Sequence, residues 1–238
     1  MEAGWGDPLF FADWERALFL HFEVDADALQ AAVPFDLDLW RGRHAVVSLV
    51  AFTMRGMRPA VGGKIASLLV APLASHPFLN ARTYVRCGDE RGIYFVREWL
   101  PNMVARCVGP AVYGLPYRLG KLAYRHRHET GEISGIVTPR QRGGCLRYHG
   151  CAVVRTGADS EWRDFLLERY TACTSGFGMR RKFRVWHSPW NATAVEVAPD
   201  DDSILKLVPG CAGARFAGAH YSAGVAGVWM GRPRRARG

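Results

Sequence analysis

The sequence predicts one α+β domain in which antiparallel sheet dominates. Its 26 glycines and 13 prolines are scattered along the chain and separate many short apolar runs, as turn residues do in a sheet-rich protein. Hydrophobic residues make up 49% of the 238 positions and charged residues 22%, which is typical of a soluble protein with a buried core. No repeat and no domain boundary stands out. We therefore expect a single domain over residues 1–230, followed by a basic, disordered tail at 231–238.

The first part of the chain predicts two strands with a short helix between them. Residues 16–24, RALFLHFEV, are typical of an apolar strand. The segment DADALQAAV that follows suits a short helix that begins after Asp25 as N-cap and stops at Pro34. Residues 44–54 are rich in β-branched side chains and predict a buried strand. Later strands are expected at 131–137, 145–155, 183–187, 193–198 and 224–230.

A hairpin is expected where GDERG joins residues 79–87 to residues 92–100. The first segment alternates and could line a cavity or form an edge facing solvent. Its polar face carries Asn80, Arg82, Tyr84 and Arg86. In the second segment Arg97 and Glu98 point to opposite faces. We expect one of them to point inward, where a charge persists only if it is paired or bound, but the pattern does not say which.

Two further helices are predicted from capping residues and apolar spacing. After Asn102, MVARCVGPAVYG suits a short helix that is interrupted or restarted at Pro110. The clearest helix is DSEWRDFLLERYTA, capped by Asp159 or Ser160. Its apolar stripe, suited to packing on the sheet, consists of Trp162, Phe165, Leu166 and Tyr170.

The net charge of +9 is weak evidence for a polyanionic partner. Four arginines lie in the last seven residues, RPRRARG, and without them the excess is +5. A solvated terminus is the simpler interpretation, and no nucleic-acid module accompanies it. The apolar runs AVVSLVAFTM and IASLLVAPLA are about half the length of a membrane span. We expect no specific nucleic acid and no membrane among the partners.

The six cysteines form no C-x-x-C pair and no Cys/His zinc spacing, so we expect no metal and no cofactor. The start, MEAGWGDPLFF, lacks the pattern of a signal peptide. Together these features favour a protein with reduced thiols in the cytoplasm.

Common catalytic motifs are absent from the sequence: it has no P-loop, nucleophile elbow or H-E-x-x-H. The glycines of VGGK at 61–64 indicate a plain loop. His126 and His128 alternate with arginines that would repel a metal cation, so we expect a solvated, charged segment there. His187 in VWHSPW either walls a pocket with its tryptophans or packs in the core beneath a bend.

Several motifs together resemble a known family. LNARTYV, LLERY, WHSPW and HYSAGVAGVW are similar, in this order, to the uncharacterised bacterial YqjF-like family over about 14–229. That family is placed in the acetoacetate-decarboxylase-like superfamily. The resemblance implies a curved antiparallel sheet that closes, or nearly closes, around a central cavity, with a few helices outside.

The resemblance also implies that the superfamily's Schiff-base chemistry is lost. LPYRLG matches the segment in which the decarboxylases carry aromatic-Pro-Lys-Lys-Leu-Gly. Tyr117 stands at the position of the imine-forming lysine, Arg118 at the neighbouring lysine, and Asn80 at the family's carboxylate. A phenol cannot form an imine, and a guanidinium is effectively never deprotonated. We therefore reject acetoacetate decarboxylation by that mechanism.

Our first hypothesis is a small-molecule-binding protein whose cavity holds an anionic, partly apolar ligand. Arginines recognise carboxylates and phosphates well, and Arg118 is the expected anchor inside the cavity. The other candidate ligand-binding residues are Asn80, Arg82, Arg97, Lys121 and His187. For Lys121 the alternatives are a displaced imine-forming amine and a solvated surface residue, and we favour the surface.

The second hypothesis is an enzyme, a lyase, isomerase or hydratase, acting on an enolisable carbonyl or carboxylate compound without a covalent intermediate. Tyr117 would be the general acid and Arg118 would stabilise an enolate, with Glu98 or His187 as base. A structural or nucleic-acid-associated protein is the third alternative and rests on charge alone. The pattern leaves a homo-oligomer open.

Overall fold

The computed structural model describes residues 7–154 and 160–236. Within these ranges the strands are β1 (Pro8–Val24), β2 (Ala45–Pro59), β3 (His76–Cys87), β4 (Glu90–Leu100), β5 (Tyr117–His126), β6 (Glu132–Pro139), β7 (Leu146–Val154), β8 (Thr171–Gly176), β9 (Met179–Trp186), β10 (Ala192–Asp201), β11 (Arg215–Gly231) and β12 (Arg234–Arg235). The helices are α1 (Ala26–Ala32), α2 (Gly63–Val70), α3 (Met103–Tyr113) and α4 (Ser160–Leu167), with the 3-10 turns η1 (Ala71–Leu73) and η2 (Ser203–Leu207). No helix in the described part of the chain is long and apolar enough to cross a membrane.

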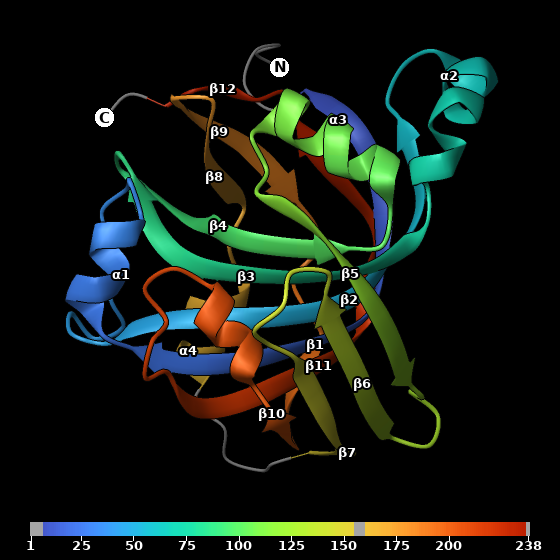
Figure 1. Cartoon of the computed structure of the whole chain (residues 1–238). Coiled ribbons are helices and arrows are strands. Elements are labelled where there is room, and N and C mark those ends of the chain that lie inside the picture. The colour runs from blue at the N-terminus through green and yellow to red at the C-terminus, as the bar shows by residue number, and fades with distance from the viewer. Residues whose placement is uncertain (1–6, 155–159, 237–238) are drawn as a thin grey trace.

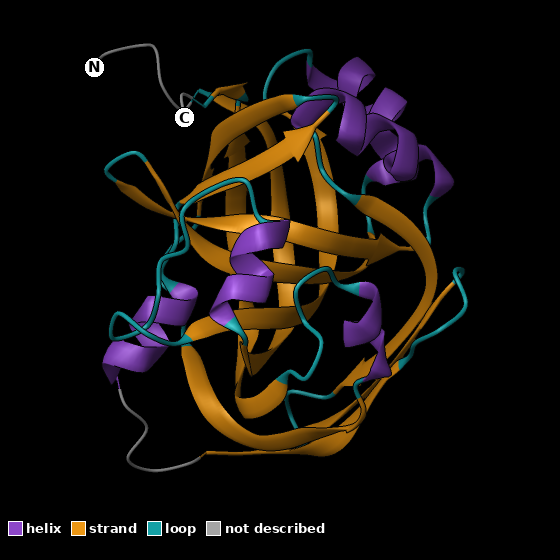
Figure 2. Ribbon diagram, turned by 60° about the vertical axis from the view of Figure 1, so that its left-hand side comes forward, coloured by secondary structure: helices purple, strands orange, loops and turns teal. Residues whose placement is uncertain are grey.

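The strands form one strongly curved sheet, mainly antiparallel, in the order β12-β9-β8-β4-β3-β2-β1-β11-β10-β7-β6-β5. Two additional pairings, β4 with β5 and β9 with β11, close the sheet on itself (Figure 1). The helices lie outside the strands (Figure 2). The predicted fold class, a curved antiparallel sheet closing on itself with a few outer helices, is confirmed.

The central strands are buried on both faces, and each face packs into its own core. The first core includes Leu49, Leu79, Trp99 and Tyr148. The second core includes Phe19, Phe52, Phe78 and Phe183, and α3 and α4 also pack into it. Because successive side chains on a strand alternate between faces, the same strands supply both cores. This explains the apolar runs at residues 17–20 of β1 and 45–52 of β2.

Several local predictions hold in detail. The Asp25 carboxylate accepts a hydrogen bond from the Ala28 amide, and α1 ends before Pro34. The Asn102 side chain caps α3 by accepting from the Ala105 amide, and Pro110 lies inside that helix. The GDERG turn joins β3 to β4 as a hairpin.

Other elements differ from the sequence-based expectation. α4 ends at Leu167, and residues 171–176 form β8 instead of a last helical turn, because they pair with β4 and β9. Of its expected caps, Asp159 lies outside the described residues. Of the VGGK segment expected as a loop, Gly63 and Lys64 instead begin α2. β5 was not predicted, because its outward positions carry basic side chains that hide the apolar alternation.

The expectations for the basic tail and for His126 are corrected. β12 pairs with β9, and Ala236 is buried, so the tail is ordered through residue 236. His126 is buried between the Arg16 carbonyl and the Tyr148 hydroxyl, and is therefore not solvated.

The cysteines were all expected to be reduced, but two of them meet between β3 and β8. Cys87 and Cys173 are paired as a disulfide. Their Cα atoms lie 7.2 Å apart, slightly beyond the usual span of such a bond.

Candidate functional site

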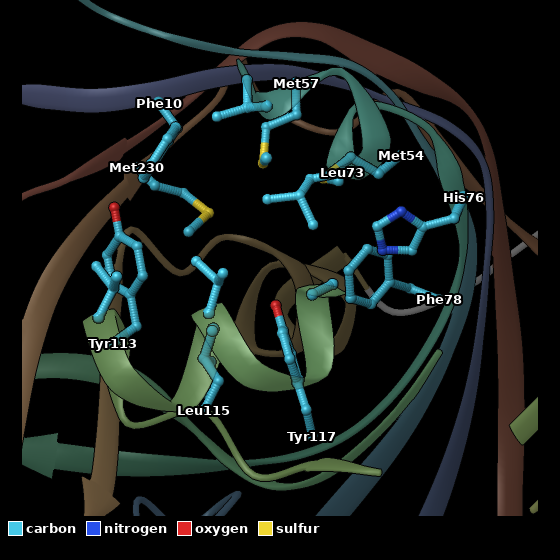
Figure 3. Close-up of a pocket in the computed structure, with 15 residues that line it drawn as sticks. Phe10, Met54, Met57, Leu73, His76, Phe78, Tyr113, Leu115, Tyr117 and Met230 are labelled. Atoms are coloured by element: carbon cyan, nitrogen blue, oxygen red, sulfur yellow. The ribbon is translucent and has the colours of Figure 1, made fainter. Parts of the chain in front are cut away.

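A pocket of about 100 Å³ lies between α3, η1 and the face of the sheet that carries the second core (Figure 3). An apolar cavity of roughly 150 Å³ can bind benzene, so this one suits a molecule of about five non-hydrogen atoms. Its lining is apolar apart from one imidazole and two phenols. The lining residues are Phe10, Met54, Met57, Val70, Leu73, His76, Phe78, Ala105, Val108, Gly109, Val112, Tyr113, Leu115, Tyr117 and Met230.

The three polar side chains of the pocket are neutral at pH 7. His76 is only 7% exposed, and neither ring nitrogen has a hydrogen-bond partner among the described residues. Burial lowers its pKa to about 4. Burial raises the pKa of Tyr113, whose hydroxyl also has no partner in the described chain. The pKa of Tyr117 is raised well above its usual value by burial, then by Glu98 and Tyr113. In Figure 3 the His76 ring and the Tyr117 hydroxyl point into the pocket.

Two more polar groups lie beside Tyr117 on the same face of the sheet. Strand register places Asn80 opposite Glu98 and Glu98 opposite Tyr117. Phe78, which lines the pocket, precedes Asn80 by two positions and therefore shares its face. Asn80 and Glu98 are both buried, and one side-chain oxygen of each has no partner among the described residues. Burial raises the pKa of Glu98 well above its usual value, which favours the protonated form of this carboxyl.

Glu98 is thus the inward-facing member of its pair with Arg97. The Tyr117 phenol and the neutral His76 imidazole line the pocket and can donate hydrogen bonds to a carbonyl or hydroxyl group in a water-poor site. The Glu98 carboxyl lies next to Tyr117 but is not part of the described lining.

Arg118 does not point into this interior, contrary to expectation. It is exposed, and its guanidinium donates to the neighbouring Tyr117 carbonyl at 3.1 Å. Consecutive residues of a strand face opposite ways, so when Tyr117 points into the pocket Arg118 must point away from it. Arg97 lies on that opposite face too, where burial and then Arg118 lower its pKa. Lys121 is exposed, as the favoured alternative for it expected.

Arg82 is buried but turned toward α4. Its Nη2 donates to the Leu166 carbonyl at 3.1 Å, and its guanidinium lies over the Phe19 ring at 5.4 Å. Burial lowers the pKa of Arg82, with Tyr84 and Glu168 opposing the shift. Arg82 does not line the pocket.

His187 packs in the core and also lies outside the pocket lining. Its Nδ1 lies 2.8 Å from the Ser188 carbonyl oxygen, and its ring contacts Tyr170 and Trp190. Burial is the largest cause of its lowered pKa. Of the two alternatives for WHSPW, the structure places this histidine in core packing beneath the bend.

Comparison with known proteins agrees with this architecture. The model of DUF2071, a family described as an uncharacterised conserved protein, matches residues 12–226. The chain belongs to this family. A DUF2071 relative, the uncharacterised protein YqjF of Bacillus subtilis (strain 168), is 27% identical over 184 residues, which cover 74% of this chain and 72% of YqjF. The expected YqjF-like family is confirmed.

Solved structures show the same fold at low sequence identity. Acetoacetate decarboxylase from Legionella pneumophila superposes with a TM-score of 0.65 at 12% identity, covering 98% of this chain and 88% of the enzyme. An acetoacetate decarboxylase-like enzyme from Sphingomonas wittichii RW1 superposes with a TM-score of 0.64 at 18% identity, covering 97% of this chain and 95% of that enzyme. The enduracididine biosynthesis enzyme MppR, complexed with pyruvate, superposes with a TM-score of 0.63 at 12% identity, covering 98% of this chain and 93% of MppR. At these identities the likeness establishes the fold of this DUF2071 protein.

Sequence reasoning missed two polar members of the pocket in this DUF2071 protein. His76 stands at the start of β3 in SHPFLN, and Tyr113 ends α3. Nothing in their local patterns signals a site, because the pocket forms only when β3, α3 and β5 come together in space.

Proposed function

We propose that this protein binds a small molecule with an apolar body and one carbonyl or hydroxyl group in the pocket beside Tyr117. The observation that supports this most is the coincidence of an apolar cavity with buried polar groups that have no partner of their own. Burying such groups costs free energy unless something bonds to them, so a ligand or water that accepts their hydrogen bonds stabilises the site. The ligand's apolar part would contact the methionines and leucines of the lining.

The charge of the ligand is a separate part of the proposal. An anionic ligand was expected because three arginines were placed near the cavity. Arg82, Arg97 and Arg118 are absent from the described lining of this pocket, whose polar groups are neutral. A negative charge taken into such a site would lose hydration without gaining a cation. We therefore favour a neutral ligand.

Binding without an imine is supported by the positions of the lysines. Lys64, Lys121 and Lys206 are exposed, and Lys182 pairs with Glu90 at 3.4 Å. No lysine occurs in the described lining of the pocket. A carbonyl compound held beside Tyr117 has no amine there to attack it.

Titration calorimetry with 2-butanone and 4-oxopentanoate tests binding and charge together, because the second probe adds a carboxylate to the first. We expect 2-butanone to bind more tightly. Tyr117→Phe should weaken it by about threefold to tenfold, the loss of one hydrogen bond. Gly109→Ala should weaken it too, because a Cβ there would lie 2.1 Å from the Tyr117 ring and force these two pocket-lining residues to shift.

Tyr221→Phe is the matched control for the hydroxyl. Tyr221 is buried in the first core, and its hydroxyl also lacks a partner among the described residues. Equal effects of the two Tyr→Phe substitutions would contradict the hydrogen bond from Tyr117. Tighter binding of 4-oxopentanoate than of 2-butanone would contradict the preference for a neutral ligand.

A second candidate function, acid/base catalysis on an enolisable carbonyl compound, is favoured by Glu98. A carboxyl whose pKa is raised by burial suits general acid/base work near neutral pH. The test is deuterium exchange at the carbons next to the carbonyl of 2-butanone, followed by NMR. Exchange should rise with pH as Glu98 ionises and should be lost in Glu98→Gln. Exchange that is equal in the wild type and Glu98→Gln would argue against catalysis and leave binding intact.

A further inference from the structure

Large apolar side chains stand exposed around the helices that line the pocket. They are Val61, Ile65, Leu68, Met103, Val104 and Val108, and we call them the α2–α3 surface. Ile65 and Leu68 are 77% and 76% exposed. The Asn102 side chain at the start of α3 donates to the Pro72 carbonyl of η1, and both α2 and α3 contact this turn. Exposed apolar side chains on neighbouring elements are typical of an interaction site.

The charged side chains on α2 and α3 themselves are all basic. Residues 39–88 and 99–128, which contain both helices, include no aspartate or glutamate. Lys64 lies on α2 and Arg106 on α3, while Arg55 and Arg58 lie near the end of β2, the strand that leads into α2. Of these, Arg55 pairs with Glu15 of β1 at 3.1 Å. The complementary partner is therefore both apolar and anionic.

A second copy of this chain fits that description poorly. In a twofold contact the same patch lies on both subunits, so basic side chains would face basic side chains. An anionic lipid surface, by contrast, offers negative headgroups above hydrocarbon. The pocket adds to this argument, because Val70 of α2 and Val108 of α3 line it. The apolar surface and the apolar cavity thus share these helices.

We propose that the α2–α3 surface docks the protein on an anionic lipid bilayer. α2 has eight residues and is too short to cross a bilayer. It would therefore lie in the membrane interface with its apolar side chains in the outer part of the hydrocarbon. Docking brings the helices that wall the pocket to the bilayer. No membrane partner was expected from the length of the apolar runs; one of those runs, IASLLVAPLA, forms the exposed α2 and η1.

Co-sedimentation with vesicles tests the proposal on the full chain. We expect binding to vesicles of phosphatidylcholine with phosphatidylglycerol, much weaker binding to phosphatidylcholine alone, and loss of binding as salt rises above about 0.15 M. Ile65→Asp and Leu68→Asp should each weaken binding by about tenfold. Because both side chains are about three-quarters exposed, these variants should melt like the wild type.

Ile136→Asp is the control, since Ile136 is an exposed apolar residue of β6, a strand far from α2 and α3 in Figure 1. It should bind vesicles like the wild type. The proposal fails if no vesicle is bound, if anionic lipid makes no difference, or if the control loses binding as much as Leu68→Asp. It also fails if Leu68→Asp converts a dimer to a monomer in sedimentation velocity without lipid. None of these outcomes bears on 2-butanone binding in solution, so the two proposals stand or fall separately.

Discussion

The folded protein is expected to lose most of its stability between pH 6.5 and pH 4. Burial lowers the pKa values of His76, His126 and His220 from 6.5 to about 4. It also lowers those of His21 and His187. In this pH window the unfolded chain binds more protons than the folded chain. The folding stability is therefore fully present above pH 6.5 and decreases as the pH is lowered toward 4.

The size of this effect follows from the three histidines whose pKa values lie near 4. Lowering the pKa of one histidine from 6.5 to about 4 corresponds to a loss of roughly 3 kcal/mol of folding stability once the group is fully titrated. Typical domains have only about 5–15 kcal/mol in total. Glu98 acts in the opposite direction, because its raised pKa makes the folded chain bind the extra proton.

Urea unfolding at a series of pH values measures this dependence. His76→Leu removes an imidazole that makes no hydrogen bond in the described structure, so this variant should lose less stability on acidification than the wild type. His128→Leu, at an exposed position, is the control. A free energy of unfolding that stays level from pH 7 to pH 4.5 would contradict the burial of neutral histidines.

Asp38→Asn is expected to destabilise the fold by about 3–5 kcal/mol, the cost of breaking a buried ion pair. The Asp38 carboxylate, which is almost fully buried, accepts from Arg169 Nη1 at 2.7 Å and from Arg91 Nε at 2.8 Å. Arg169 is also buried and follows α4. Substitution of the carboxylate leaves that guanidinium without its counter-charge. The measurement is the free energy of urea unfolding at pH 7.

Glu132→Gln is the control, because its pair with Arg127 at 3.6 Å is about half exposed and should contribute less than about 1 kcal/mol. Burial would raise the pKa of Asp38, but hydrogen bonds from Arg169 and Arg91 outweigh it and hold the pKa below 3.8. This contribution is therefore present above pH 3.8 and is lost as pH falls through the lowered pKa. Equal destabilisation by the two substitutions would contradict a buried pair.

Much of the secondary structure was predictable because side chains alternate between the two faces of a strand and because helix ends carry capping residues. The apolar run of β1, the GDERG hairpin and the Asn102 cap each depend on neighbours in sequence. β12 and β8 were not predictable in this way, because their short segments become strands only through partners far along the chain.

The site was predictable only in part. The resemblance pointed to Tyr117, which does line a pocket. It also led us to expect Arg118 inside the same pocket, and this expectation was wrong. Strand alternation allows one of two adjacent residues to face the pocket, and recognising residues 117–126 as a strand would have separated them. His76 and Tyr113 could not be found from sequence, since no spacing links β3 to α3.

Methionine-methyl NMR gives the most direct test of the pocket beside Tyr117 as a ligand site. Met54, Met57 and Met230 line this pocket, whereas Met103 and Met179 are exposed elsewhere. We predict that titration with 2-butanone shifts the three pocket methyl signals along one saturable curve and leaves the other two in place. Shifts that fail to saturate, or that affect Met103 and Met179 as much as the pocket methionines, would contradict a binding site in this pocket.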